Sequence, residues 1–168
     1  MCDTVQKSGS DAAIIRIHSK DKAIAVSVDS SANYCKAYPL VGGKQIVCEN
    51  WRNLIAVGAK PLAITNCLNF GNPENEEIMG EFAECLEGIR EACEFLNYPV
   101  VSGNVSFYNG TNKKNINPTP VIGGVGLIKK LSKPLNHIFK KDNSTLVLIG
   151  KMFGHLEQSC FLKENYSI

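Results

Sequence analysis

The sequence has few of the residues from which catalytic and metal-binding sites are usually built. Its three histidines, at positions 18, 137 and 155, lie far apart and show no metal-ligand spacing. No pair of carboxylates lies in an acid–base arrangement, because the acidic run at 74–77 is typical of a solvated helix start. The residues themselves therefore indicate no catalytic centre in this chain.

Paired cysteines and a secretory signal are missing as well. The seven cysteines are odd in number and irregular in spacing, and no C-x-x-C pair is present, which argues against a disulfide framework and a zinc site. Several lie in apolar runs, where cysteine behaves as a small buried hydrophobic residue. Because the N-terminus shows no secretory signal, a reducing cytoplasm is the expected compartment.

Strong charge of one sign and long hydrophobic runs are also absent. The formal net charge is +2. The lysine pairs at 113–114, 129–130 and 140–141 are not interleaved with aromatic residues, so they are interpreted as solvated surface residues. No apolar stretch approaches the roughly 18 residues that a membrane span needs. We therefore expect neither nucleic acid nor a membrane as a partner.

Two glycine-containing stretches resemble nucleotide-binding motifs but lack essential positions. Gly42-Gly43-Lys44 is followed by glutamine, so the full phosphate-loop pattern is absent. Gly124-x-Gly126 lies in an expected strand and opens no helix, which excludes a dinucleotide-binding fingerprint. These last glycines are more typical of a bulge or a close crossing of backbones.

The pattern of apolar residues predicts a mixed α/β fold, with helices covering a sheet. The expected strands are 11–17 and 23–29, as a hairpin or adjacent strands, then 61–66, 99–107 and 119–128. The expected helices are 43–57 and 74–97, the second with an apolar stripe at helical spacing. Turns or loops are expected at 30–41 and 68–73.

The expected domain organisation leaves the C-terminal part incomplete. The polar residues 1–10 are typical of a linker, 11–130 form the α/β domain, and 131–143 form a second linker. A fully apolar run at 145–149 predicts one more strand. One strand cannot bury its own apolar surface, so 144–168 is expected to be the incomplete start of a further domain.

Residues 99–109 are the most informative stretch, because an apolar run ends there in polar residues. Gly103 has no Cβ, so the backbone can approach a ligand closely. Asn104 and Ser106 add neutral oxygens of the kind that suit a phosphate-bound magnesium ion. A nucleotide or phosphate site is one interpretation; an ordinary hairpin turn, favoured by Asn109-Gly110, is the other.

Six segments taken together resemble one known family. The segments are Asp11-Ala-Ala-Ile-Ile-Arg-Ile17, Gly42-Gly-Lys44, Glu49-Asn-Trp-Arg-Asn-Leu-Ile-Ala-Val-Gly-Ala59, Pro61-Leu-Ala-Ile-Thr-Asn-Cys-Leu-Asn-Phe-Gly-Asn-Pro73, Val101-Ser-Gly-Asn-Val-Ser-Phe-Tyr-Asn109 and Pro118-Thr-Pro-Val-Ile-Gly-Gly-Val-Gly-Leu-Ile128. They resemble phosphoribosylformylglycinamidine synthase, the synthetase subunit of purine biosynthesis, and specifically the second internal half of its smaller, multi-subunit form. The resemblance implies the N-terminal fold of aminoimidazole ribonucleotide synthetase, with helices on one face of the sheet.

The resemblance also implies an activity, cofactors and partners. The family enzyme is a carbon–nitrogen ligase that uses ATP, Mg²⁺ and ammonia to convert formylglycinamide ribonucleotide to its amidine. Ammonia comes from a separate glutaminase subunit, and a small accessory subunit completes the assembly. The two N-terminal domains of the synthetase pack together into a barrel-like core, so the remaining half of the synthase is an implied partner.

Four site residues follow from the resemblance. The positions of Asn66 and Gly103 bind the nucleotide in the family, that of Asn104 binds the metal, and that of Ser106 contacts the substrate. The family usually has aspartate where Asn66 stands, so negative charge is lost there. The stretch Asp29–Tyr34 lacks the catalytic histidine of the family's first half, as expected of the second half.

The expected function is therefore that of a fragment of the synthase, inactive alone, which carries part of an ATP, magnesium and substrate site. Two alternatives stay open at this point. The chain can be a scaffold that self-associates through an uncovered sheet, or a complete small ATP-binding protein of the same superfamily.

Overall fold

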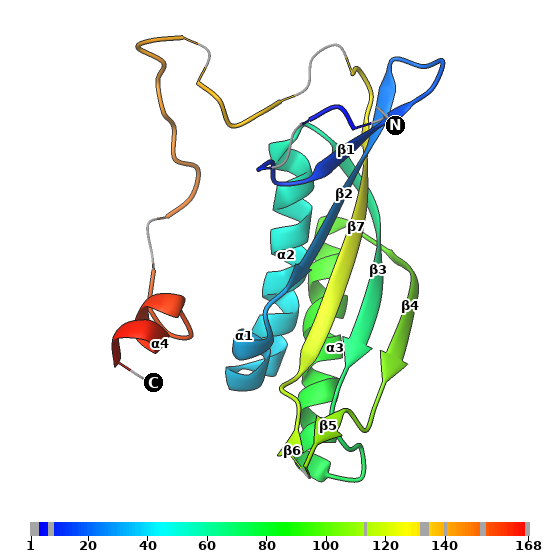
Figure 1. Cartoon of the computed structure of the whole chain (residues 1–168), viewed down its shortest axis with the longest axis vertical. Helices are drawn as coiled ribbons and strands as arrows, with labels where there is room; N and C mark the ends of the chain where they lie inside the picture. Colours follow the sequence, from blue (N-terminus) through cyan, green and yellow to red (C-terminus); the bar gives the residue numbers. More distant parts are fainter. Residues whose placement is uncertain are drawn as a thin grey trace. The chain divides into compact units, whose positions relative to one another are not determined.

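The structure is a computed structural model that describes residues 4–6, 9–112, 114–131, 135–139, 141–151 and 154–166 (Figure 1). The chain divides into two compact units, Met1–Asn136 and His137–Ile168. The first unit contains the sheet and its helices, and the second contains the helix α4, Cys160–Tyr166.

A five-stranded mixed sheet forms the centre of the first unit, with the strand order β1-β2-β7-β3-β4. The strands are β1 Ala13–Ile17, β2 Lys22–Ser30, β3 Lys60–Asn69, β4 Val100–Ser106 and β7 Thr119–Ile128. β1 and β2 are adjacent and antiparallel, as the sequence predicts. β7 is antiparallel to both β2 and β3, and β3 is parallel to β4. β2, β3 and β4 therefore all end at the same edge of the sheet.

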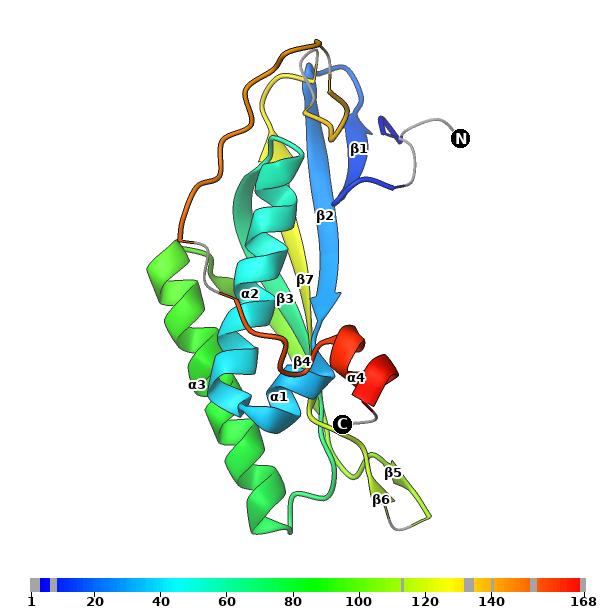
Figure 2. The same cartoon turned by 90° about the vertical axis from the view of Figure 1, so that its left-hand side faces the viewer.

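Helices cover one face of this sheet (Figures 1 and 2). They are α1 Ala32–Ala37, α2 Pro39–Ala56 and α3 Glu76–Leu96. The stripe expected on α3 is confirmed, because Ile78, Cys85, Ile89 and Cys93 are all buried. They pack in one core with residues of the sheet such as Ile64. The predicted mixed α/β fold, with helices on one face, is thus confirmed.

The segment 30–41, expected as turns, is mostly helical instead. It contains α1 and the first turn of α2, which begins at Pro39. Proline at the first helical position is favourable, because its φ angle already fits a helix and its missing N–H has no partner there. Gly42 and Gly43 therefore lie inside α2 rather than at its start.

The glycines inside the helices have a packing role. A Cβ at Gly43 would lie 2.4 Å from the carbonyl oxygen of Cys85, and a Cβ at Gly88 would lie 2.1 Å from that of Leu40. The backbones of α2 and α3 thus touch at these positions. This packing requirement overrides the low intrinsic helix propensity of glycine.

The opposite face of the sheet is apolar along β1, β2 and β7. Ile15, Ile24, Val28 and Val125 are exposed there, Val28 to 67%. Within the unit Met1–Asn136, no helix of the described residues covers this face (Figure 2). Exposed contiguous apolar surface of this kind is typical of a binding surface.

The strand predicted at 145–149 is not present in the second unit. Those residues have no regular secondary structure, and Val147 and Ile149 are 76% and 94% exposed. A strand is stable only when a neighbouring strand accepts and donates its backbone hydrogen bonds. The described part of His137–Ile168 contains no such neighbour.

Candidate functional site

The candidate site lies at the edge where β2, β3 and β4 end. The loop after β3 and the short hairpin of β5, Gly110–Thr111, and β6, Lys114–Asn115, lie at this edge (Figure 1). In open α/β sheets, ligands usually bind outside the carboxyl ends of the strands. The position of the edge therefore agrees with a ligand site.

Residues 102–106 form a strand, and the hairpin-turn alternative for them is wrong. β4 continues to Ser106 and pairs in parallel with β3, with Asn66 opposite Gly103, Cys67 opposite Asn104 and Asn69 opposite Ser106. The turn comes afterwards, where Tyr108 has a φ of 59°. A parallel pair needs a long crossover connection, which α3 supplies.

The register divides the four predicted site residues between the two faces of the sheet. Side chains alternate along a strand, so Asn66 and Gly103 belong to the face covered by helices. Asn104 and Ser106 belong to the open face. The structure thus brings the residues together in two pairs rather than at a single point.

Gly103 makes room for the side chain of Asn66. A Cβ at Gly103 would lie 1.9 Å from Oδ1 of Asn66 and 2.8 Å from its backbone oxygen. Any larger residue at 103 would force the amide away. The fold itself thus requires glycine here, independently of any ligand.

Asn66 lines a mostly apolar hollow of about 550 Å³ between the sheet and α3. Arg90, on the rim of this hollow, already forms two ion pairs, one with Glu94 at 2.6 Å and one with Glu87. Its guanidinium also donates hydrogen bonds to the Glu87 carboxylate, and these lower the pKa of Glu87. The hollow therefore offers an amide and apolar walls, but no unpaired cation for a phosphate.

The open face has a polar cluster at the ends of β3 and β4. The side-chain amide of Asn69 donates to the carbonyl oxygens of Cys67 and Thr119, each at 3.3 Å. The amide of Asn109 donates to the carbonyl oxygens of Ser106 at 2.8 Å and Phe70 at 3.0 Å. These bonds fix the backbone around the predicted substrate residue.

Asn104 and Ser106 can offer two neutral oxygens to a divalent cation. Mg²⁺ binds oxygen ligands and keeps several waters, usually together with substrate phosphates. The described residues contain no group of three His, Cys, Asp or Glu side chains that could hold a metal ion. The donor set thus fits a magnesium ion that arrives with a nucleotide, and does not fit a metal held by the described residues alone.

Asp29, at the end of β2, is fully engaged in a network that the sequence did not reveal. Its carboxylate accepts from Ser27 Oγ at 2.7 Å and from the amides of Asn50 and Asn53, each at 2.8 Å. The Tyr98 hydroxyl donates to Asn50 Oδ1 at 2.8 Å. Burial raises the pKa of Tyr98. The network joins α2 to the sheet, so Asp29 has a structural role at this edge.

Gly124, which the sequence assigned to a bulge or a close crossing, makes room for this network. A Cβ there would lie 1.9 Å from Asn50 Oδ1 and 2.2 Å from the Tyr98 hydroxyl. The prediction of a bulge or a crossing of backbones is wrong at Gly124, because two side chains make the close approach and the register with β2 is unbroken. The sequence did not predict this hydrogen-bond network, because its polar residues lie far apart in the chain.

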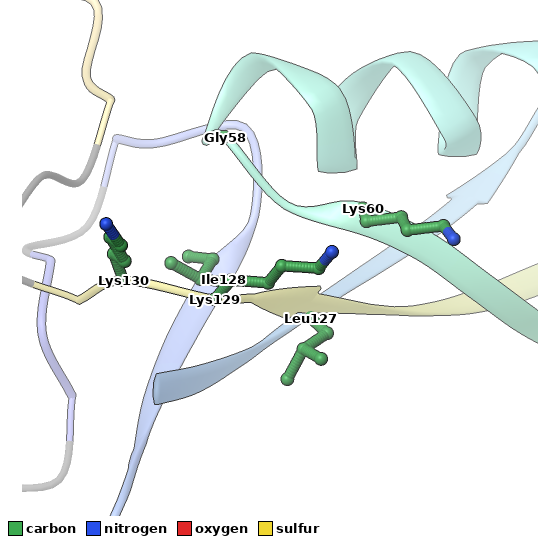
Figure 3. Close-up of a pocket in the computed structure, with 6 residues that line it drawn as sticks. All are labelled: Gly58, Lys60, Leu127, Ile128, Lys129 and Lys130. Atoms are coloured by element: carbon green, nitrogen blue, oxygen red, sulfur yellow. The ribbon is translucent and has the colours of Figure 1, made fainter. Parts of the chain in front are cut away.

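Three lysines surround a second hollow, of about 460 Å³, at the opposite edge of the sheet. Figure 3 shows Lys60 at the start of β3 and Lys129 and Lys130 just after β7, with Gly58 and Leu127 beside them. No described carboxylate forms an ion pair with these lysines. They lie at the far edge from Ser106, so they supply no cations to the candidate site.

Comparison with known proteins identifies the class of protein. Residues 9–128 match the family described as AIR synthase related protein, N-terminal domain, and the chain belongs to this family. The PurL subunit of phosphoribosylformylglycinamidine synthase from Pelagibacter ubique is 62% identical over 164 residues. That match covers 98% of this chain and 22% of the relative. The chain thus spans about a fifth of the length of the curated relatives it matches.

Solved structures of a PurL are similar as well. T. maritima PurL complexed with ATP and with FGAR is 37% identical, with a TM-score of 0.70, over 75% and 76% of this chain and 21% of that one. PurLQS from Thermotoga maritima is 36% identical, with a TM-score of 0.72, over 79% of this chain and 22% of that one. None of the helices in the described part of the chain has the length and apolar character to cross a membrane.

Proposed function

We propose that this chain is part of a phosphoribosylformylglycinamidine synthase, an ATP-dependent carbon–nitrogen ligase of purine biosynthesis. The observation that carries the proposal is the 62% identity to a PurL subunit along 98% of the chain. Short motifs recur by chance, but identity of this extent does not. The chain corresponds to an N-terminal-type α/β domain of the second half of the synthetase and acts in the cytoplasm.

The proposed role is to supply part of the site in which ATP activates the amide oxygen of formylglycinamide ribonucleotide. Asn104 and Ser106, on one face of β4, would contact the magnesium ion of the nucleotide and the substrate. Asn66 and the backbone at Gly103 would contact the nucleotide. β4 is an edge strand, so the backbone groups on its outer side are free to bind a ligand.

The site needs further groups from outside the described residues. The hollow beside Asn66 contains no unpaired cation, and at the Ser106 edge Lys114 of β6 lines a hollow of about 400 Å³. Transfer of a phosphoryl group requires more positive charge around the phosphates than one lysine supplies. The rest of the synthase would supply that charge. The isolated chain is therefore inactive in this proposal, and the catalytic groups lie elsewhere.

The partners follow from the uncovered face and from the relatives. The apolar open face of the sheet would pack against the homologous half of the synthetase. The PurLQS assembly of a relative suggests two further partners, a glutaminase subunit and a small accessory subunit. Residues 1–10 and 131–143 would be linkers, and 144–168 the start of the following domain. The same open face favours one alternative, a scaffold that self-associates through the sheet.

Titration of Mg-ATP and Mg-ADP into the purified chain by calorimetry tests the proposed site. Asn104 is exposed on the open face, so Asn104→Ala should remove a metal contact without disturbing the fold. We expect saturable binding that weakens about tenfold or more in this variant, because one oxygen ligand to the bound cation is lost. Ser102→Ala, on the same face of the same strand, is the matched control.

Equal affinity in wild type and a folded Asn104→Ala variant would overturn the metal assignment. The scaffold alternative predicts a different pair of results: no nucleotide binding, and a light-scattering mass that rises with protein concentration. The two measurements on one sample therefore separate these functions.

A further inference from the structure

Exposed lysines gather at the edge of the sheet opposite Ser106, where no acidic side chain balances them. Lys60 begins β3, Lys22 begins β2, and Lys129 and Lys130 follow β7. Within the described residues, none of these lysines forms an ion pair or donates a side-chain hydrogen bond. Like charges repel one another, so the fold holds these cations close together without neutralising them.

The register of the sheet brings these lysines together from three strands. Lys60 lies opposite Leu127 of β7, and Lys129 follows two residues later, at the spacing from which long side chains of neighbouring strands can reach one another. Figure 3 shows the side chain of Lys129 turned back along β7, toward the side of Lys60. On the other side of β7, β2 begins at Lys22, one residue before its last pairing with β7.

The hollow of about 460 Å³ between these side chains has the size and the walls of a small-molecule site. Sites for small molecules usually have volumes of roughly 300–1,000 Å³, with apolar walls and a few polar groups. Here Leu127 and Ile128 are apolar, and the lysines provide the charge. We call this hollow the lysine pocket; its lining residues are Gly58, Lys60, Leu127, Ile128, Lys129 and Lys130.

The end of α2 does not account for the lysines. α2 ends at Ala56, close in sequence to the pocket residue Gly58, and the carbonyl groups at a helix C-terminus attract cations. The carbonyl oxygens of Leu54 and Ile55, however, already accept backbone N–H groups of residues that follow the helix. The chain itself therefore caps this helix end, and the positive charge of the pocket is left for another anion.

We propose that the lysine pocket is a binding site for a diphosphate group, separate from the candidate site at the Ser106 edge. A single phosphate group carries about −1.5 to −2 charges at pH 7, so two linked phosphates match three lining lysines better than one does. Lysine binds phosphate oxygens through charge-assisted hydrogen bonds. Free pyrophosphate and a nucleoside diphosphate offer this same chemistry.

Calorimetric titration of sodium pyrophosphate into the purified chain, in buffer that contains EDTA, tests the proposal. EDTA removes divalent cations, so a site that requires a magnesium nucleotide does not contribute. We expect saturable binding that Lys60→Gln/Lys129→Gln weakens about tenfold or more, because charge-assisted hydrogen bonds are lost. Lys44→Gln/Lys163→Gln removes the same charge away from the pocket, and at about 0.15 M salt, which screens distant charges, it should bind as wild type does.

Titration of ADP in the same buffer distinguishes the two sources of the diphosphate group. Tighter binding of ADP than of pyrophosphate assigns the ligand as a nucleoside diphosphate, whose base would lie on the apolar wall. Equal or weaker binding of ADP assigns it as free pyrophosphate. Both results support the lysine pocket as a diphosphate site.

Nuclear magnetic resonance of the backbone amides gives the place of binding. Pyrophosphate should shift the amide signals of 127–130, and Asn104→Ala should bind it as wild type does. The proposal is overturned if wild type shows no saturable binding, if the control variant weakens binding as much as the pocket variant, or if Asn104→Ala abolishes binding. Because this assay contains neither ATP nor magnesium, its failure would leave the proposed function standing, and the reverse also holds.

Discussion

Asn66 and Gly103 share one small space between β3 and β4, and this fixes the identity of residue 103. We expect Gly103→Ala to destabilise the fold by about 1–3 kcal/mol, the usual cost of overpacking, because the added Cβ meets Asn66 Oδ1 at 1.9 Å. Urea unfolding followed by circular dichroism measures this free energy.

The double variant Asn66→Ala/Gly103→Ala should recover part of the loss, since the amide that the new Cβ meets is removed. Asn66→Ala alone completes the double-mutant cycle, which gives the interaction free energy between positions 66 and 103. A Gly103→Ala variant as stable as wild type would contradict the close approach of the two residues.

At the scale of single residues, the sequence predicted only part of how the site residues are arranged. The stretch around Gly103 was correctly predicted to be a strand, and its ligand-binding role stays a prediction. The sequence alone did not show that Asn66 lies opposite Gly103, because the register of two parallel strands depends on packing across the whole sheet. The side of the sheet on which Asn66 lies was missed for the same reason, whereas Gly103 and Asn104 lie on opposite faces through alternation along β4 alone.

At the scale of helices and strands, the contact between the backbones of α2 and α3 is the strictest packing requirement of the fold. We expect Gly88→Ala to cost about 3 kcal/mol or more, at the upper end of overpacking, because its Cβ would lie 2.1 Å from the rigid carbonyl of Leu40. Thermal and urea unfolding of the purified variant provide the measurement.

Gly80, two turns earlier on the same helix, is the matched control. A Cβ there meets nothing within 4 Å, so Gly80→Ala should stabilise the chain by about 0.5–1 kcal/mol through helix propensity alone. Equal effects of the two substitutions would mean that α2 and α3 do not touch at Gly88.

Elements with a strong apolar period were predictable, and those set by long-range packing were not. α3 has an uninterrupted apolar stripe, so its existence followed from the sequence. It begins at Glu76, two residues later than expected, after Asn75, whose side chain accepts from the Glu77 N–H at 2.9 Å. The start of α2 at Pro39 was missed because the serine, asparagine and proline residues of 30–41 locally favour turns. The run at 145–149 has the composition of a strand but no neighbour with which to pair.

At the scale of the whole molecule, the chain has a complete core but an incomplete site. The sheet and three helices bury a continuous apolar cluster, while one face of the sheet stays open and the hollow beside Asn66 has no unpaired cation. A folded unit with one uncovered face is expected of a piece of a larger enzyme. The chain spans only 22% of its PurL relative, which agrees with this account.

The most direct test is an exchange of this chain into a full-length relative. The segment of Pelagibacter ubique PurL that matches this chain would be replaced by residues 4–166, and ATP-dependent amidine formation from formylglycinamide ribonucleotide and ammonia would be measured. We expect the chimera to be active, Asn104→Ala in the chimera to lower kcat/KM by about tenfold or more, and the isolated chain to have no activity. A chimera that folds and binds its subunits but forms no amidine would contradict the proposed function.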